Sequence, residues 1–290
     1  MELTADGISL NKVIHLEIDV ANDSKLDCLE SLVAYVHRIS DTYPSPFTLF
    51  VSGGIDSQTM LYVWKLSGVP FNAVHVRYNG FNDHDIEECK LFCDRERIEL
   101  SYLDFDILDF LENHLDHYAT IYQCASPQLC THMRFSELVS GGTKVFSGNI
   151  PYPGRLSIDN TIFGLQRYAT ITNSSIIPFF LMSDSAVAKS SVIQMNRNDE
   201  GLSSLHHDPY LFKCARYEML GIPIIPQSNK LTGFERLKDY YDAFGDRVTV
   251  KMKLAHSSLP SKRVFDQLFR NKYLIKFKNH YTPVFLINEK

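Results

Sequence analysis

Apolar residues in the first part of the chain alternate between strand spacing and helix spacing. Residues 12–20 show partial alternation of apolar and polar positions, which predicts a strand. Residues 24–39 carry apolar side chains three and four positions apart, as an amphipathic helix does. Residues 47–51 form a continuous, mainly apolar run that is typical of a buried parallel strand. The next segment has helical spacing and ends at Gly68.

The same alternation continues through the middle of the chain. Further strands are predicted at 71–77, 99–105 and 144–147. Helices are predicted at 83–97, after an N-cap at Asp106, and at 126–139. Strands that alternate with helices at these intervals indicate an α/β fold with a doubly wound parallel sheet. In such sheets ligands bind beyond the carboxyl ends of the strands.

The last third of the chain gives a less regular pattern. It predicts a strand at 176–182, helices at 184–194 and 209–221, and a helix further on, where Phe265, Phe269, Tyr273 and Phe277 have helical spacing. We therefore expect a mostly helical C-terminal extension. The expected division is an N-terminal strand and helix that pack on the core (1–46), a nucleotide-binding α/β domain (47–182) and a C-terminal substrate region (183–290).

The residues between the strand at 47–51 and its following helix form a candidate anion site. They read Ser52-Gly53-Gly54-Ile55-Asp56-Ser57. A strand, a glycine turn and a helix start direct backbone N–H groups and the positive end of a helix dipole to one point. The two serines add hydroxyl donors. Asp56 places a carboxylate beside the phosphates, which predicts a Mg²⁺ between them and makes Asp56 a candidate metal ligand and catalytic residue.

These six residues match the SGGxDS signature, and the chain resembles the PP-loop ATP pyrophosphatases. The resemblance implies a HUP (adenine nucleotide alpha-hydrolase-like) fold and cleavage of ATP between the α and β phosphates, with a substrate oxygen adenylated and AMP then displaced. It implies that the backbone at the end of the second sheet strand, from Val74 to Tyr78 and including Val76 and Arg77, lies beside the adenine. Arg77 fits a phosphate or carboxylate contact as well as it fits a surface salt bridge.

The resemblance extends to two further positions. Gly148 stands where relatives have a glycine followed closely by an acid for Mg²⁺-pyrophosphate, but here Asn149 follows and no carboxylate appears before Asp159. Asn149 is therefore the weaker candidate ligand for the metal. In the C-terminal part, which loosely resembles asparagine synthetase-like domains, Lys230 matches the lysine that meets the phosphates. We expect no glutaminase domain, because no cysteine precedes Cys28.

Composition and charge bear on the state of the cysteines, on nucleic-acid binding and on membrane association. The six cysteines contain no CxxC pair, which favours buried, reduced thiols over a metal or disulfide role. The chain carries a net charge of −5, but residues 247–280 contain nine lysine and arginine residues against Asp266 alone. That basic segment fits a nucleic-acid surface or a solvated helical face. No apolar run has membrane-spanning length, and we expect a cytoplasmic protein without a membrane partner.

Three functions follow as hypotheses. The first is an AMP-forming ligase of the asparagine synthetase-like type that uses ATP and Mg²⁺ and acts on a small-molecule acceptor with a carboxylate or amide. The second is an enzyme that adenylates a base of tRNA or DNA and holds the nucleic acid with residues 247–280. The third is a nucleotide-binding protein without turnover, which the missing acid after Gly148 keeps open.

Overall fold

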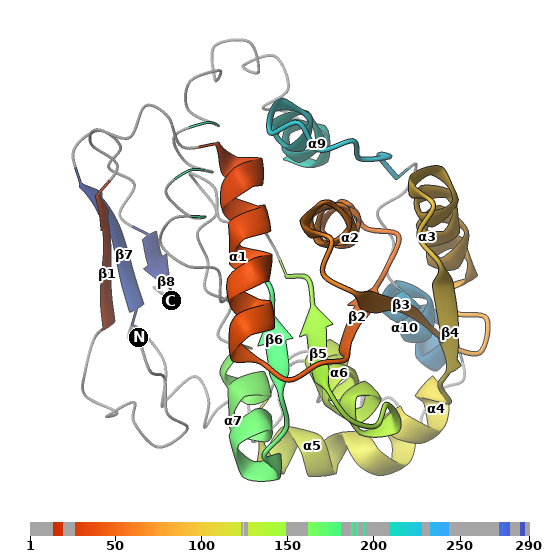
Figure 1. Cartoon of the computed structure of the whole chain (residues 1–290). Helices are drawn as coiled ribbons and strands as arrows, with labels where there is room; N and C mark the ends of the chain where they lie inside the picture. Colours follow the sequence, from red (N-terminus) through yellow and green to blue (C-terminus); the bar gives the residue numbers. More distant parts are fainter. Residues whose placement is uncertain are drawn as a thin grey trace.

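A computed structural model describes the chain at residues 14–19, 27–122, 124, 127–148, 162–180, 187, 190, 194, 209–227, 233–243, 273–278 and 285–287. Its centre is a parallel sheet of five strands in the order β4-β3-β2-β5-β6 (Figure 1). The strands are β2 (Phe47–Val51), β3 (Phe71–Arg77), β4 (Leu100–Asp104), β5 (Thr143–Phe146) and β6 (Ile176–Pro178). This is the doubly wound α/β fold that the sequence predicts.

The first strand of this sheet in chain order, β2, lies at its centre. Phe50 of β2 is in register with Val74 of β3 on one side and with Phe146 of β5 on the other. The chain moves outward from β2 to β3 and β4, and then crosses to β5 and β6. The strand order therefore reverses between β2 and β5. In open parallel sheets this switch point is where the loops diverge and leave a crevice for ligands.

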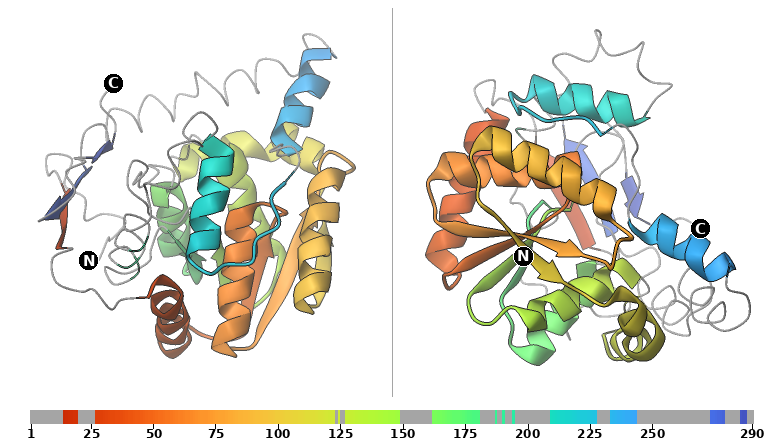
Figure 2. Two further views of the ribbon diagram at one scale, coloured as in Figure 1. Left: turned by 90° about the horizontal axis from the view of Figure 1, so that it is seen from above. Right: turned by 90° about the vertical axis from the view of Figure 1, so that its right-hand side faces the viewer.

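Helices cover both faces of the sheet. In Figures 1 and 2, α1, α2 and α3 lie on one face and the helices from α5 to α7 on the other. The helical segments up to the last strand of the sheet are α1 (Cys28–Thr42), α2 (Ile55–Ser67), α3 (Asp83–Glu96), α4 (Ile107–Asp109), the π-helical η1 (Phe110–His114), α5 (Leu115–Ile121), α6 (Pro127–Leu138) and α7 (Ile162–Thr172).

Two later helices contribute side chains to the two apolar cores. Helix α9 (Pro209–Met219) contributes Tyr217 to the apolar core that also contains Trp64 of α2. Helix α10 (Gly233–Ala243) contributes Leu237 to the second core, around Phe135 of α6. Burial of these apolar side chains fixes α9 beside α2, and this brings residues of the C-terminal region to the loop that follows β2.

Several element boundaries follow from local chemistry that the sequence predicts. The Asp106 side chain accepts a hydrogen bond from the Asp109 amide at 3.0 Å, which confirms the predicted N-cap. Gly68 ends α2 with a φ of 69°, a left-handed conformation that glycine adopts without strain. Helix α1 begins later than predicted, because Asp27 caps it by accepting from the Glu30 amide at 2.9 Å.

Other expectations differ from the structure. Residues 273–278, whose aromatic spacing predicted a helix, form strand β7 (Tyr273–Lys278). This strand pairs in parallel with β1 (Ile14–Asp19) and antiparallel with β8 (Phe285–Ile287) in a separate three-stranded sheet. Spacing alone was misleading here, because strand pairing between the two ends of the chain is not visible in a local pattern. Helix α7 was not predicted.

Among the described helices, none combines the length and the apolar character that a membrane crossing requires.

Candidate functional site

The SGGxDS loop lies at the carboxyl end of β2, next to the end of β5. Residues 52–54 connect β2 to α2, and Gly54 is the N-cap of that helix. The first N–H groups of α2 have no acceptor within the helix and are left to bind other groups. Gly148, two residues beyond the end of β5, has a φ of 74°, so the chain turns there in a conformation that favours glycine. The predicted loop and Gly148 thus flank the switch point.

Three serine hydroxyls from three elements meet at this point. Ser57 Oγ, in the first turn of α2, lies 3.0 Å from Ser52 Oγ and 3.3 Å from Ser147 Oγ. Ser147 follows β5 directly, so its hydroxyl joins the loop from across the switch point. Hydroxyls rotate and can donate to an anion, and this group is the polar lining expected of a phosphate site.

Asp56 has a counter-charge within the protein. Lys213 Nζ of α9 lies 2.6 Å from Asp56 Oδ2, and the Tyr217 hydroxyl donates to Asp56 Oδ1. Lys213 is 3% exposed, so its ammonium group has been taken out of water and depends on this carboxylate. Tyr217 is buried one helical turn further along α9. Helix α9 therefore contributes a cation and a hydroxyl to the SGGxDS loop.

The first glycine of the motif is held against α3. The Gly53 amide donates to Asp85 Oδ1 at 2.8 Å, and Asp85 Oδ2 lies 3.0 Å from His75 Nε2. A Cβ at Gly53 would lie 2.7 Å from the Glu88 Cβ and 2.8 Å from the Asp85 carbonyl oxygen. At Gly54, by contrast, a Cβ would meet the Ser52 Oγ at 3.3 Å. The backbone of Gly53 therefore lies so close to α3 that a side chain at this position would collide with the helix.

The segment after α9 closes the site on another side. The Gln58 side chain donates to the Gly53 and Ile225 carbonyls at 2.7 and 2.9 Å, and it accepts from the Ile225 amide at 2.6 Å. The Gln227 side chain donates to Glu88 of α3. Residues 222–227 therefore run past the start of α2 and are anchored to both helices.

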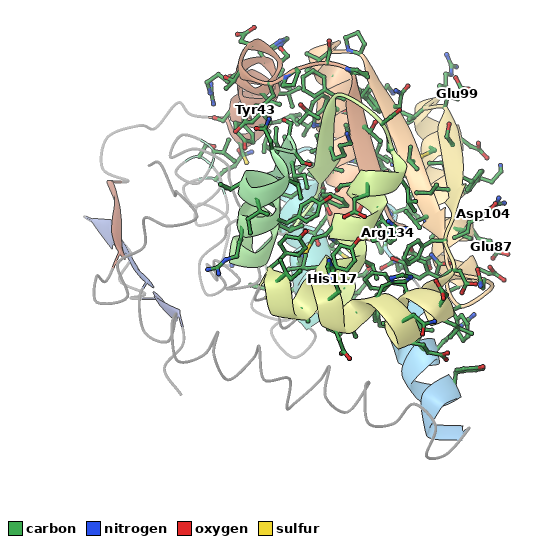
Figure 3. All side chains as sticks on the ribbon, turned by 90° about the horizontal axis from the view of Figure 1, so that it is seen from below. Tyr43, Glu87, Glu99, Asp104, His117 and Arg134 are labelled. Carbon is green, nitrogen blue, oxygen red and sulfur yellow. The ribbon has the colours of Figure 1, made fainter. Side chains whose placement is uncertain are left out.

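The predicted adenine-binding positions already carry hydrogen bonds. Asn82 Nδ2 donates to the Val76 carbonyl at 2.7 Å, and Asn82 Oδ1 accepts from the Tyr78 amide at 2.8 Å. Arg77 forms a two-pronged ion pair with Asp104 of the edge strand β4, at 2.7 and 2.8 Å; Figure 3 labels Asp104 at the rim of the molecule. Of the two roles that the sequence left open for Arg77, the surface salt bridge is the one seen here. The nucleotide-binding roles of Val76 and Arg77 stay predictions.

The remaining predicted residues lie outside the described part of the chain. These are Asn149, Lys230 and most of the basic segment 247–280. Their proposed roles as metal ligand, phosphate-contacting lysine and nucleic-acid surface stay predictions. Ile55 opens α2 with a buried side chain, so it can offer only its backbone to a ligand.

A Mg²⁺ ligand role for Asp56 does not fit the donor set in this arrangement. Both carboxylate oxygens are engaged, one by the Lys213 ammonium and one by the Tyr217 hydroxyl. In the ranges that the structure describes, three or more histidine, cysteine, aspartate or glutamate side chains do not gather in a metal-binding group. The presence of Asp56 in the candidate anion site does not by itself require a metal, because Lys213 balances the charge of this carboxylate.

Sequence reasoning missed Lys213, Tyr217 and Ser147. A signal for Lys213 was present in the predicted helix 209–221, where Tyr210, Cys214 and Tyr217 form a stripe three and four residues apart. Lys213 stands beside that stripe, and a lysine on the buried side of a helix is an informative exception. Ser147 gives no such signal, because a serine after a strand is common in loops.

Comparisons with protein-family models and with curated proteins find no match for this chain. Among solved structures, it is similar to NMN synthetase from Francisella tularensis (14% identity, 90% of this chain and 99% of that one, TM-score 0.40). It is also similar to NH3-dependent NAD synthetase from Campylobacter jejuni subsp. jejuni NCTC 11168 (12%, 81% and 94%, 0.38) and to U34-tRNA thiolase NcsA from Methanococcus maripaludis (13%, 83% and 79%, 0.36). Similarities this low do not assign a function.

Proposed function

We propose that the chain is an ATP-dependent, AMP- and pyrophosphate-forming synthetase that adenylates a carboxylate or amide oxygen for attack by a nitrogen nucleophile. One observation carries this proposal. The SGGxDS loop ends the central strand at the switch point of the sheet, and it gathers the hydroxyls of Ser52, Ser57 and Ser147 there. The position is the one at which open α/β sheets bind ligands, and the lining suits phosphates.

The reaction proceeds in two steps. The acceptor oxygen attacks the α-phosphorus of ATP and forms a new P–O bond, while the bond from that phosphorus to the bridging oxygen breaks and pyrophosphate leaves with the electron pair. The nitrogen nucleophile then attacks the adenylated carbon, displaces AMP and loses a proton. Neither step needs a nucleophilic side chain, so positioning and electrostatic stabilisation supply the acceleration.

Each part of the site has a role in the first step. The serine hydroxyls and the first N–H groups of α2 donate to the phosphate oxygens. Lys213 neutralises charge that develops on the leaving pyrophosphate, the role that the family resemblance predicts for Lys230. Asp56 keeps Lys213 at the loop through their ion pair.

The test compares Lys213→Met with Lys65→Met. Lys65 lies in the last turn of α2, where it pairs with Glu96 at the surface, and it serves as the matched control. We expect wild-type protein to bind ATP in calorimetry and to release pyrophosphate when supplied with a suitable acceptor from a panel of carboxylates and amides. Lys213→Met should lower the rate of pyrophosphate release at least about a hundredfold, whereas Lys65→Met should leave it unchanged.

Two outcomes would contradict the proposal. If the wild-type protein binds no ATP, the SGGxDS loop is not a nucleotide-binding site. A Lys213→Met protein that melts like wild type and turns over at the wild-type rate would remove the role of Lys213. Lys213→Arg, which keeps the charge, separates a folding defect from loss of the cation: it should melt close to wild type and retain more activity than the methionine variant.

A further inference from the structure

The Gly53 amide of the SGGxDS loop is bonded to a carboxylate. Gly53 N–H donates to Asp85 Oδ1 at 2.8 Å, and the other oxygen of Asp85 lies 3.0 Å from His75 Nε2. Asp85 comes from the first turn of α3 and His75 from the middle of β3. The chain of bonds therefore links the loop after β2 to the neighbouring strand through one side chain. A negatively charged group directly at a phosphate loop is unexpected, because it repels phosphates.

The chemistry of the pair fixes its orientation. An ionised carboxylate only accepts hydrogen bonds, so His75 Nε2 must carry the hydrogen that it shares with Asp85. His75 is 1% exposed, and its Nδ1 atom is buried without a hydrogen-bond partner in the described part of the chain. Among the described residues, the bond to Asp85 is thus the polar interaction that holds the ring, and it in turn fixes the rotation of the Asp85 carboxylate.

Helix α3 also packs closely against the loop at Gly53. A Cβ at Gly53 would lie within 3 Å of the Glu88 Cβ and of the Asp85 carbonyl oxygen. The Gln58 side chain holds the Gly53 carbonyl from the other side at 2.7 Å. Both backbone groups of Gly53 are therefore bound by side chains, and the glycine has one fixed orientation.

We propose that Asp85 is a positioning residue for the phosphate loop. It holds the Gly53 amide, which takes this N–H out of the set of phosphate donors, and it thereby fixes the backbone that leads into Gly54 and the first turn of α2. His75 keeps the carboxylate turned toward Gly53. This inference rests on the proposed function, because it assigns the role of Asp85 through the ATP phosphates that the loop binds.

The charge of Asp85 should weaken ATP binding by repelling the phosphates, whereas its hydrogen bond to Gly53 should strengthen ATP binding by holding the loop. If Asp85 acted on phosphates through its charge alone, its removal would tighten ATP binding, since a repulsion would be lost. If Asp85 positions the loop, loss of the acceptor frees the Gly53 amide and weakens ATP binding. The direction of the change therefore distinguishes the two.

The experiment measures ATP dissociation constants by calorimetry for Asp85→Ala and Asp85→Asn. Asp85→Ala should weaken binding about tenfold or more, the effect of losing a hydrogen bond to a charged group. Asp85→Asn keeps an acceptor for Gly53 without the charge, so it should bind ATP as tightly as wild type or more tightly. Glu87→Ala and Glu87→Gln are the controls: Glu87 is an exposed carboxylate on the same helix, labelled in Figure 3, and its variants should bind like wild type.

A second measurement follows the His75 ring by ¹⁵N NMR, with its signal identified by its loss in His75→Gln. In wild type the Nε2 atom carries the hydrogen. In Asp85→Asn the carboxamide donates to Nε2 instead, so the hydrogen should move to Nδ1 and exchange the two nitrogen shifts. This signature does not depend on ATP and reports the pair even if the proposed function fails.

The outcomes separate the two proposals. Wild-type protein without ATP binding contradicts the proposed function, and the positioning role of Asp85 fails with it. Wild-type binding together with an Asp85→Ala protein that binds equally or more tightly overturns the role of Asp85 alone. An Asp85→Asn protein as weak as Asp85→Ala, or one whose His75 signal is unchanged, also overturns it, because the acceptor geometry is the proposed cause.

Discussion

Single residues at the carboxyl edge of the sheet carry unusual environments, and His132 is one of them. Its ring stacks on Phe146, the last residue of β5, with centroids 4.5 Å apart and planes 12° apart. Its Nδ1 atom is buried without a hydrogen-bond partner among the described residues. Burial lowers the pKa of His132 from 6.5 to about 4, because the charged form cannot be solvated there.

This shift predicts a pH dependence of stability. The folded pKa lies below the unfolded one, so the unfolded chain binds more protons as the pH falls from about 6.5 to about 4. Protonation of His132 in the unfolded chain should therefore lower the free energy of unfolding by about 1 to 3 kcal/mol relative to its value above pH 6.5. His132→Phe keeps a stacked ring without this titration, so its stability should fall less over that range in denaturant unfolding. His117→Phe, at an exposed position of α5 labelled in Figure 3, should follow the wild-type profile.

The cysteines confirm a prediction made from sequence. All six are buried thiols outside any disulfide, as the absence of CxxC pairs indicated. Burial raises the pKa of Cys28 to about 12, so its thiol stays protonated near neutral pH. An aromatic disulfide reagent at pH 8 should react with almost no thiol of the native protein and with all six after denaturation. Rapid labelling of the native chain would contradict the burial of these side chains.

At the scale of elements, the start of α2 is fixed by segments far along the chain. Residues 222–227 are bonded to Gln58 of α2, and α9 reaches Asp56 through Lys213. Sequence patterns predicted both α2 and the helix at 209–221, but not that they touch. Amphipathic spacing shows that a helix has a buried face, and it does not show which neighbour covers that face.

The packing of residues 222–227 against α2 predicts that a substitution between uncharged side chains lowers the free energy of unfolding strongly. Gln58→Ala removes three hydrogen bonds of a buried carboxamide and leaves the backbone groups of Ile225 and the Gly53 carbonyl without that partner. We expect a loss of about 2 to 4 kcal/mol in the free energy of unfolding, measured with urea. Gln128→Ala, at an exposed position of α6, should change it by less than about 0.5 kcal/mol. Equal stabilities of the two variants would contradict the docking described here.

For the whole molecule, the sequence predicts the parallel sheet well and the surroundings of the site poorly. The boundaries of β2 and β3 are as predicted, because buried strands of this kind produce continuous apolar runs. The loop at 52–57 could be found because its glycines and hydroxyls are adjacent in sequence. Lys213, Asp85 and Ser147 could not be assigned to it, because tertiary packing alone brings them there. Pairing of β1 with β7 is likewise a long-range effect, which overrides the helical spacing of Tyr273 and Phe277.

The ion pair between Asp56 and Lys213 joins residues 157 positions apart. A fragment that ended before α9 would retain all five strands of the parallel sheet and the complete SGGxDS string, and yet its Asp56 would have lost its cation. Expression of the α/β half by itself would therefore deliver the signature without the cation that lies beside Asp56 in the whole chain. In this protein the motif lies in the first half of the polypeptide, and the lysine that balances the charge of its aspartate lies in the second half.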